Sequence, residues 1–310
     1  MKQKLCRIAT LLLAAVLFSL TACGAPAEPI SDELASIAEN AAPGEATAPE
    51  ERAPGESAPD EGETAVPGGE ETAAAPEAES IPGTPAEVLA AYTAVMNKAK
   101  KDAKYFRKLE YQQIGKDSNF EAEWINHPAV LDAANMLMTT KDDGLKADMY
   151  TKGVTDMYAD LPLYQFPVGC MVKDPGVFTR AVARQLPNGD VELTLVMKDE
   201  NNPEPPAPGA KTSPSHTGEM FNPVSKAVVD DLLNGPIVRL GFWGKPPEIS
   251  TRYFNCTSVL VYSPGTQRIV TLRQEYYVRI NILSGKALGF INVAGYATAE
   301  GLTACDNFRY

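Results

Sequence analysis

The chain has 310 residues, with 28 Lys and Arg against 40 Asp and Glu and a formal net charge of -12. An apolar content of 44% is too high for a wholly disordered chain, and a mean hydropathy of -0.19 is too low for a protein with many membrane spans. The negative charge argues against nucleic acid as a partner, because phosphate binding needs a basic surface.

The acidic charge is concentrated in one segment. Residues 24–84 contain 15 acidic side chains and one basic side chain, Arg52, whereas residues 85–310 contain 25 acidic and 24 basic side chains. The part after residue 84 is therefore almost neutral. The low pI of 4.8 reflects the acidic segment and does not indicate an acidic binding face.

The first residues have the three parts of a secretory signal. Lys2, Lys4 and Arg7 precede an apolar run over residues 11–20, and small residues follow the run. The run is about half the roughly 20 residues that a permanent membrane-spanning helix needs. We therefore expect this segment to direct export without remaining as a transmembrane anchor.

The segment Leu20-Thr21-Ala22-Cys23 resembles the lipobox of bacterial lipoproteins. The resemblance covers about 24 residues and implies cleavage before Cys23, with a diacylglycerol on its thiol. Two acyl chains hold a protein stably at a membrane. The alternative is an ordinary signal peptide cut at an Ala-x-Ala-like site. The resemblance implies a mature chain anchored through Cys23 to the outer face of a bacterial cell membrane.

Residues 24–84 are predicted to form a disordered tether between the lipid and a folded domain. They contain nine Pro, seven Gly and fifteen Ala, and no aromatic residue. Such a segment buries too little apolar surface to offset its conformational entropy. Its acidic run serves solvation and spacing in this interpretation, and partner or cation binding in the alternative. The chain is thus divided into a signal peptide (1–22), a lipidated Cys23 with its tether (23–84) and one domain (85–310).

Three helices are predicted in the domain. Thr84 as N-cap, Pro85 at the first helical position and Glu87 closing a capping box predict a helix whose apolar face includes Tyr92 and Met96. Two further helices are predicted over residues 129–137 and 223–233.

The remaining pattern predicts antiparallel strands. Residues 177–186 and 191–198 flank Asn188-Gly189, a strong hairpin signal, and residues 253–262 and 268–282 form a second pair. On the last strand one face is apolar except for Gln274. The same face carries Val270, Leu272, Tyr276, Val278, Ile280 and Ile282. Residues 288–297 and 302–308 extend the meander.

These elements predict an α+β domain in which N-terminal helices pack on an antiparallel meander, flat or curved. The order loosely resembles cystatin-like folds and the half-barrels of lipoprotein carriers. That resemblance is one of fold only, and fold does not imply function.

The sequence offers no local catalytic or metal-binding motif. His127 and His216 are 89 residues apart without ligand-spaced partners, so we expect no metal and no cofactor. Ser215 and His216 could suggest a nucleophile and its base, but adjacent residues rarely face each other, and an exposed loop histidine is the plainer interpretation. No catalytic residue is assigned.

Three cysteines remain beyond Cys23. Cys256 and Cys305 lie in neighbouring parts of the predicted meander, which makes them the candidate disulfide pair. The alternative is that Cys170, Cys256 and Cys305 are buried free thiols, because the domain does not look like a small disulfide-dependent scaffold.

Two segments keep a binding role open. Residues 201–223 contain six Pro and no predicted element, and a loop of that length is usually functional or mobile. Phe242 and Trp243 follow between Gly and Pro residues, and with Tyr276 they are candidate ligand contacts. The alternative is that the aromatic pair closes the edge of the core.

Three functions remain compatible with the sequence. The first is a non-catalytic surface lipoprotein whose domain binds an unknown extracytoplasmic ligand or protein. The second is a carrier of lipids or other apolar molecules in a curved sheet, and the third is an enzyme whose site leaves no local motif.

Overall fold

The computed structural model describes residues 81–128, 132, 135, 148–151, 161–234, 239, 242, 245–287 and 289–310. The signal peptide, the lipobox (Leu20, Thr21, Ala22 and Cys23) and the tether up to residue 80 lie outside the described residues, as do Trp243 and most of the helix predicted over residues 129–137.

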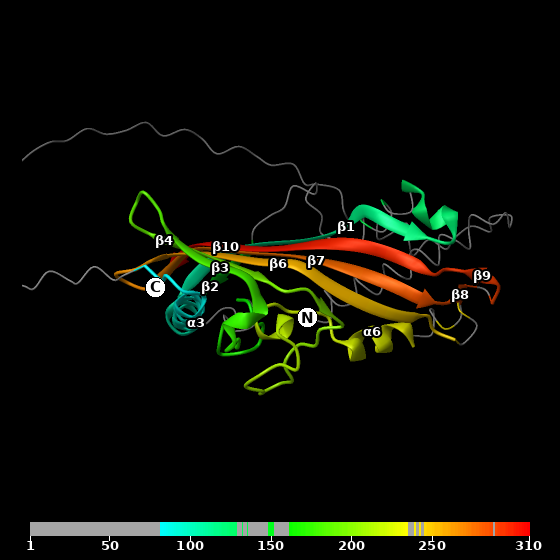
Figure 1. Cartoon of the computed structure of the whole chain (residues 1–310), viewed down its shortest axis with the longest axis horizontal. Coiled ribbons are helices and arrows are strands. Elements are labelled where there is room, and N and C mark those ends of the chain that lie inside the picture. Colours follow the sequence, from blue (N-terminus) through cyan, green and yellow to red (C-terminus); the bar gives the residue numbers. More distant parts are fainter. Residues whose placement is uncertain are drawn as a thin grey trace, which may run out of the picture. The chain divides into compact units, whose positions relative to one another are not determined.

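An eight-stranded antiparallel sheet forms the centre of the described fold (Figure 1). Its order is β2-β1-β10-β7-β6-β4-β3, and the short β5 pairs with β6. The strands are β1 (Tyr105–Phe120), β2 (Asp148–Thr151), β3 (Phe178–Gln185), β4 (Val191–Met197), β5 (Glu200–Asn201), β6 (Glu248–Ser263), β7 (Arg268–Ser284) and β10 (Gly295–Arg309). The predicted antiparallel sheet is confirmed.

Long strands dominate the middle of the sheet. β6, β7 and β10 pair in that order as a meander, and β1, the first strand of the domain, pairs with the last strand, β10. Of the two segments expected at the end of the meander, residues 302–308 lie within β10, whereas residues 288–297 are divided between a short strand, β9, and the start of β10 at Gly295. A separate two-stranded ribbon, β8 (Lys286–Ala287) with β9 (Ile291–Asn292), occupies the connection from β7 to β10.

The first predicted helix is confirmed with its cap. α3 (Pro85–Asp102) begins after Thr84, whose hydroxyl accepts from the Glu87 amide while the Glu87 carboxylate accepts from the Thr84 amide. The buried face of α3 belongs to the same core cluster as side chains of β4, β6 and β7.

The described helical content is smaller than a layer of N-terminal helices would require. α6 (Lys226–Leu233) lies within the helix predicted over residues 223–233 but begins three residues later. It comes late in the chain, and its Val229 packs against a second, smaller cluster that contains Ile282. Three single-turn 3-10 helices, η1 (Glu123–Asn126), η2 (Pro175–Val177) and η3 (Thr217–Glu219), complete the described helical segments.

The β3–β4 hairpin forms as predicted. Val191, Leu193, Leu195 and Met197 are buried on alternating positions of β4, and Gly189 takes the positive φ of 88° that the turn requires.

The β6–β7 hairpin corrects one detail of the predicted core. A register shift between Val261 and Tyr262 places Ile269 opposite Tyr262, so Ile269 is buried while Val270 is 40% exposed. Gln274 nevertheless remains on the buried face, 4% exposed.

Candidate functional site

A row of polar side chains crosses the inner face of the sheet. The register sets Glu110 of β1 opposite Thr303 of β10, Thr303 opposite Gln274 of β7, and Gln274 opposite Ser258 of β6. Ser258, Gln274 and Thr303 are buried. We call these four residues the polar row. Buried polar atoms must find partners, so the row dictates what covers this part of the sheet.

Two tyrosine hydroxyls supply partners to the polar row. The Tyr92 hydroxyl lies 2.9 Å from Ser258 Oγ and accepts from Gln274 Nε2 at 3.3 Å. The Tyr164 hydroxyl donates to Glu110 Oε1 at 3.1 Å and lies 3.4 Å from Thr303 Oγ1. Burial raises the pKa of both tyrosines well above the ordinary value, so both hydroxyls keep their protons.

An ion pair between a buried lysine and the partly exposed Glu110 lies at the β1 end of the row. Lys108 is 3% exposed, its Nζ lies 3.1 Å from Glu110 Oε2, and the same ammonium lies 4.2 Å from the centroid of the Tyr164 ring. An unpaired buried ammonium would cost several kcal/mol, and the carboxylate and the ring face offset that cost. Lys108, Glu110 and Tyr164 therefore act as one unit.

Tyr276 lies one step along the sheet from the polar row. Its hydroxyl accepts from Gln112 Nε2 at 2.8 Å, and its ring lies 5.8 Å from that of Tyr253. Gly301 on β10 makes room for it, because a Cβ there would collide with the Tyr276 ring. Tyr276, a candidate ligand contact, is thus engaged within the domain, and burial raises its pKa well above the usual value.

The sequence placed Tyr276 with Phe242 and Trp243 as candidate ligand contacts. The structure does not bring Tyr276 and Phe242 together: Tyr276 packs on the main core, while Phe242 is 5% exposed in the second cluster. Phe242 thus occupies the position expected if the aromatic pair closes the core. Trp243 lies outside the described residues.

Two segments cover the polar row. The first, residues 161–172, presents Tyr164 between Leu163 and Gln165, both with positive φ. The second, residues 202–222, we call the strap. Gln274 Nε2 donates to the Met220 carbonyl of the strap at 3.3 Å. Asn222 Oδ1 accepts from the Tyr164 amide at 3.0 Å and so joins the two covering segments.

The strap consists of an outgoing and a returning arm joined by a tight turn. Its outgoing arm, residues 203–208, contains four prolines. The Ala210 amide donates to the Ala207 carbonyl at 2.9 Å, and Gly209 has a φ of 77° after Pro208. Proline followed by glycine with positive φ is the pattern of a type II turn.

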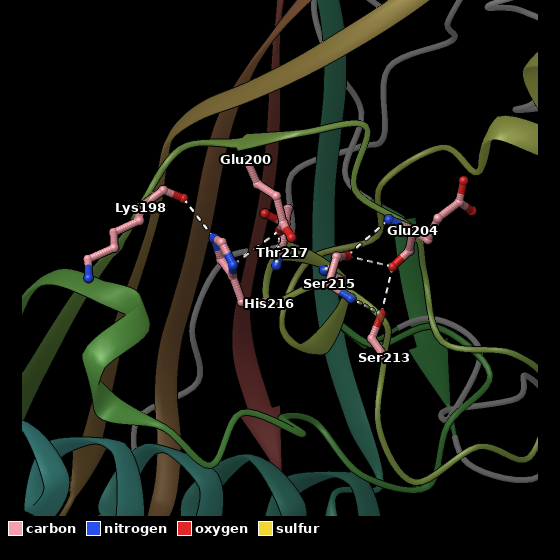
Figure 2. A network of polar contacts seen from close by, with 8 residues as sticks. Lys198, Glu200, Glu204, Ser213, Ser215, His216 and Thr217 are labelled. Carbon is pink, nitrogen blue, oxygen red and sulfur yellow. Dashed lines mark hydrogen bonds and ion pairs between the residues drawn. The ribbon is translucent and has the colours of Figure 1, made fainter.

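Serine side chains hold the two arms together (Figure 2). Ser213 Oγ and Ser215 Oγ both donate to the Glu204 carbonyl, at 2.6 and 2.7 Å, and Ser215 Oγ also accepts from the Glu204 amide at 2.9 Å. Gly218 lets the backbones approach, because a Cβ there would collide with the Glu204 carbonyl oxygen and with Ser213 Oγ. The base of the strap is therefore held by specific contacts.

His216 joins the strap to the strand region that precedes it. Its Nε2 lies 3.0 Å from the Lys198 carbonyl oxygen and its Nδ1 lies 3.4 Å from Glu200 Oε2. The same Glu200 oxygen accepts from the Thr217 amide at 2.8 Å. Figure 2 shows His216 and Ser215 directed to opposite sides, His216 toward Lys198 and Ser215 toward Glu204. The arrangement is thus not that of a nucleophile and its base.

A surface depression of about 300 Å³, open solvent included, lies where the strap meets α6 and β6. The charged residues that line it already bind one another through a hydrogen bond and an ion pair. Glu204 Oε1 accepts from the Lys226 amide at 2.8 Å, and Lys226 Nζ pairs with Asp230 at 2.6 Å. Because that volume includes open solvent, the depression itself is smaller than a typical small-molecule site, and these contacts leave few groups free for a ligand.

The candidate disulfide between Cys256 and Cys305 does not form. Cys170, Cys256 and Cys305 are buried free thiols. β7 separates β6 from β10, which puts the two cysteines about 10 Å apart at the closest strand spacing, whereas a disulfide needs Cα atoms within about 7 Å. Burial raises the pKa of Cys170 to about 11 and that of Cys256 to about 12. Neither thiol is therefore an activated nucleophile.

Sequence reasoning missed the polar row and the serine contacts. Gln274, which interrupts an apolar face, was the available signal for the row. Its partners Glu110, Ser258 and Thr303 are far away in the chain and become neighbours only through the register. For the strap, the signal was Ser213-Pro214-Ser215 in a proline-rich loop.

Within the described ranges, no group of three or more His, Cys, Asp or Glu side chains is placed to hold a metal ion. Among the same residues, no helix is long and apolar enough to cross a membrane. Comparisons of the chain with protein-family models, with curated proteins and with solved structures give no match.

Proposed function

We propose that this protein is a bacterial lipoprotein, held through a diacylglycerol on Cys23 at the outer face of a cell membrane, whose domain binds a partner protein through the strap. The lipobox and the apolar run before it support the anchor. The acidic, proline-rich tether supports display of the domain away from the surface.

One observation carries the binding role. Contacts at Glu204 hold the base of the strap, while its tip, including Pro208, Lys211 and Thr212, is exposed. A loop with a fixed base loses little conformational entropy on binding, so its contacts contribute directly to affinity. Binding residues are commonly found on loops that a rigid scaffold positions.

The two other functions have less support. A carrier needs an apolar cavity, and the space between α3 and the sheet is filled by side chains, among which Tyr92, Met96 and Leu260 are 0% exposed. An enzyme needs available nucleophiles or acids, and Ser215, Glu110 and the thiols are committed to structural contacts or buried.

The anchor is tested by replacing the lipid-bearing residue. Intact mass of the mature wild-type chain is expected to correspond to 288 residues from Cys23 plus a diacylglycerol. The Cys23→Ala variant is expected to leave the membrane fraction. An unmodified wild-type chain, or a Cys23→Ala variant that stays membrane-bound, contradicts the anchor.

The binding role is tested by photo-crosslinking in the producing cells. A photoreactive amino acid replaces Thr212 at the tip of the strap, and in a matched control it replaces Thr271, which is exposed on β7. A discrete protein adduct is expected from position 212 and not from position 271. The adduct should weaken in a Ser213→Ala, Ser215→Ala variant. No adduct, or the same adduct from both positions, contradicts the role.

A further inference from the structure

The outgoing arm of the strap is conformationally restricted by its own composition. Four of the six residues 203–208 are prolines, which fix φ near -65°, and a residue before proline is driven to extended conformations. Only Glu204 and Ala207 carry a backbone N–H. Such a segment favours polyproline II, a helix with three residues per turn and no internal hydrogen bonds.

The burial of the prolines follows that period of three. Pro203 and Pro206 are buried against the domain, whereas Pro205 is half-buried and Pro208 is exposed. In a polyproline II helix, residues three apart lie on the same edge. One edge of the arm therefore packs inward, and the edge that carries Pro205 and Pro208 faces outward.

The outward edge is held in place and leads to a positive charge. The backbone polar groups of Glu204, which polyproline II leaves without partners, bind Ser213 and Ser215. Beyond the turn, Lys211 is exposed and makes no ion pair with the residues that the structure describes. The three-residue period of the arm ends at the turn after Pro208, and Lys211 is the first charged residue beyond that turn.

We infer that the Pro205–Pro208 edge and Lys211 form a recognition surface for a partner protein domain with an aromatic-lined groove and a carboxylate at one end. Proline rings of a polyproline II segment pack on aromatic side chains, and binding costs little entropy because the segment is already ordered. Lys211 supplies the charge that fixes orientation along the groove. This inference rests on the proposed binding role of the strap and names the chemistry of its partner.

The partner's chemistry distinguishes this surface from a nucleic-acid or membrane contact. Nucleic acids and anionic membranes are bound through several Lys or Arg side chains. The strap contains one lysine, Lys211, and two carboxylates, Glu204 and Glu219. An aromatic groove requires only the proline edge and tolerates the neighbouring carboxylates.

The test uses the full chain in its cells with the photoreactive residue at position 212. The Pro205→Ala, Pro208→Ala variant is expected to reduce the adduct by about tenfold, and Lys211→Glu to reduce it by a smaller factor. The matched control, Pro187→Ala, removes an exposed proline from the β3–β4 turn and is expected to leave the adduct unchanged. Unchanged hydrogen exchange at the Glu204 amide verifies that the strap stays folded in the variants.

A second measurement examines the partner directly. The partner identified in the adduct is purified without the crosslink and titrated with a synthetic peptide of residues 202–213. Its tryptophan or tyrosine fluorescence is expected to change when this peptide binds. A control peptide in which Pro205 and Pro208 are both alanine is expected to leave the fluorescence unchanged. An adduct that persists in the Pro205→Ala, Pro208→Ala variant, or a partner that binds both peptides equally, overturns the inference and leaves the binding role intact. The absence of any adduct from position 212 overturns both.

Discussion

Two adjacent rows on the inner face of the sheet differ in chemistry. In one row Leu193, Leu260 and Leu272 face one another across β4, β6 and β7; two residues further along β6 and β7, Ser258 and Gln274 occupy the equivalent positions. Burial of apolar side chains stabilises the leucine row and does not depend on orientation, whereas the polar row requires hydrogen-bond partners at defined positions. The second row therefore determines which segments cover it and where the strap lies.

The largest effect is expected in the leucine row. Leu260 is 0% exposed, and Leu260→Ala is expected to lower the free energy of unfolding by about 3 kcal/mol through lost burial and the cavity left behind. Urea denaturation of the full chain measures this change in the free energy of unfolding. Val270→Ala, at a position 40% exposed, is the control and should change stability by less than about 0.5 kcal/mol. Equal losses at both positions would contradict the described register.

The next effect belongs to the polar row. Gln274→Leu removes the donor to the Tyr92 hydroxyl and to the Met220 carbonyl, and it is expected to cost about 1 to 3 kcal/mol. Because Met220 belongs to the strap, proteolysis within the strap should also become faster. Unchanged proteolysis would show that Gln274 does not anchor the strap.

Thr217→Val, in the strap, is the matched comparison for Gln274→Leu, because it also replaces a buried polar side chain by an apolar one. Thr217 is 0% exposed, and its Oγ1 is the one buried side-chain polar atom among the described residues that has no hydrogen-bond partner. Replacing an unsatisfied hydroxyl by a methyl group of the same shape should be neutral or stabilising by up to about 1 kcal/mol. A loss as large as that of Gln274→Leu would contradict the assignment.

Local patterns predicted the elements that the chain specifies locally. The capping box of Thr84 and Glu87, and the Asn188-Gly189 turn, each depend on residues close in sequence, and both formed as expected. The leucine face of β4 was equally predictable, since strand periodicity alone decides it. In the described part of the chain these are the features in which local propensity and tertiary packing agree.

Features set by register were not predictable in the same way. Ile269 is buried in place of Val270 because of the register shift beside Tyr262. The continuity of β10 depends on its two neighbours, β1 and β7. The polar row combines four strands whose order no local pattern reveals. The signal peptide, the lipid on Cys23, the tether and the helix over residues 129–137 remain predictions.

An alkaline loss of stability is expected from the buried thiols. Cys170 and Cys256 have pKa values raised to about 11 and 12, whereas unfolded cysteine titrates at about 8.5. The folded chain therefore binds these protons more tightly, so stability is complete below about pH 8.5 and falls as the pH rises toward 11 and 12. Unfolding free energies at pH 7.5 and 9.5 measure the fall, which a Cys170→Ala, Cys256→Ala variant should reduce. An unchanged slope in that variant would exclude the thiols as its cause.

The smallest effect is expected at the exposed face of the hairpin. Arg184 pairs with Glu192 at 3.0 Å, but the arginine side chain is 67% exposed. Arg184→Ala should change the unfolding free energy by no more than about 0.5 kcal/mol, and less at high salt. A larger loss would indicate a contact of Arg184 that the described residues do not contain.

Hydrogen exchange across the strap tests the central claim most directly, because that claim is that side chains fix an exposed loop at its base. In the wild-type chain the amides of Glu204 and Gly218 should be protected, since both donate to Ser215 Oγ, while that of Thr212 exchanges fast. Ser215→Ala should remove the protection at Glu204 and Gly218 and leave that of β4 unchanged. Wild-type amides of Glu204 and Gly218 that exchange as fast as that of Thr212 would contradict the account.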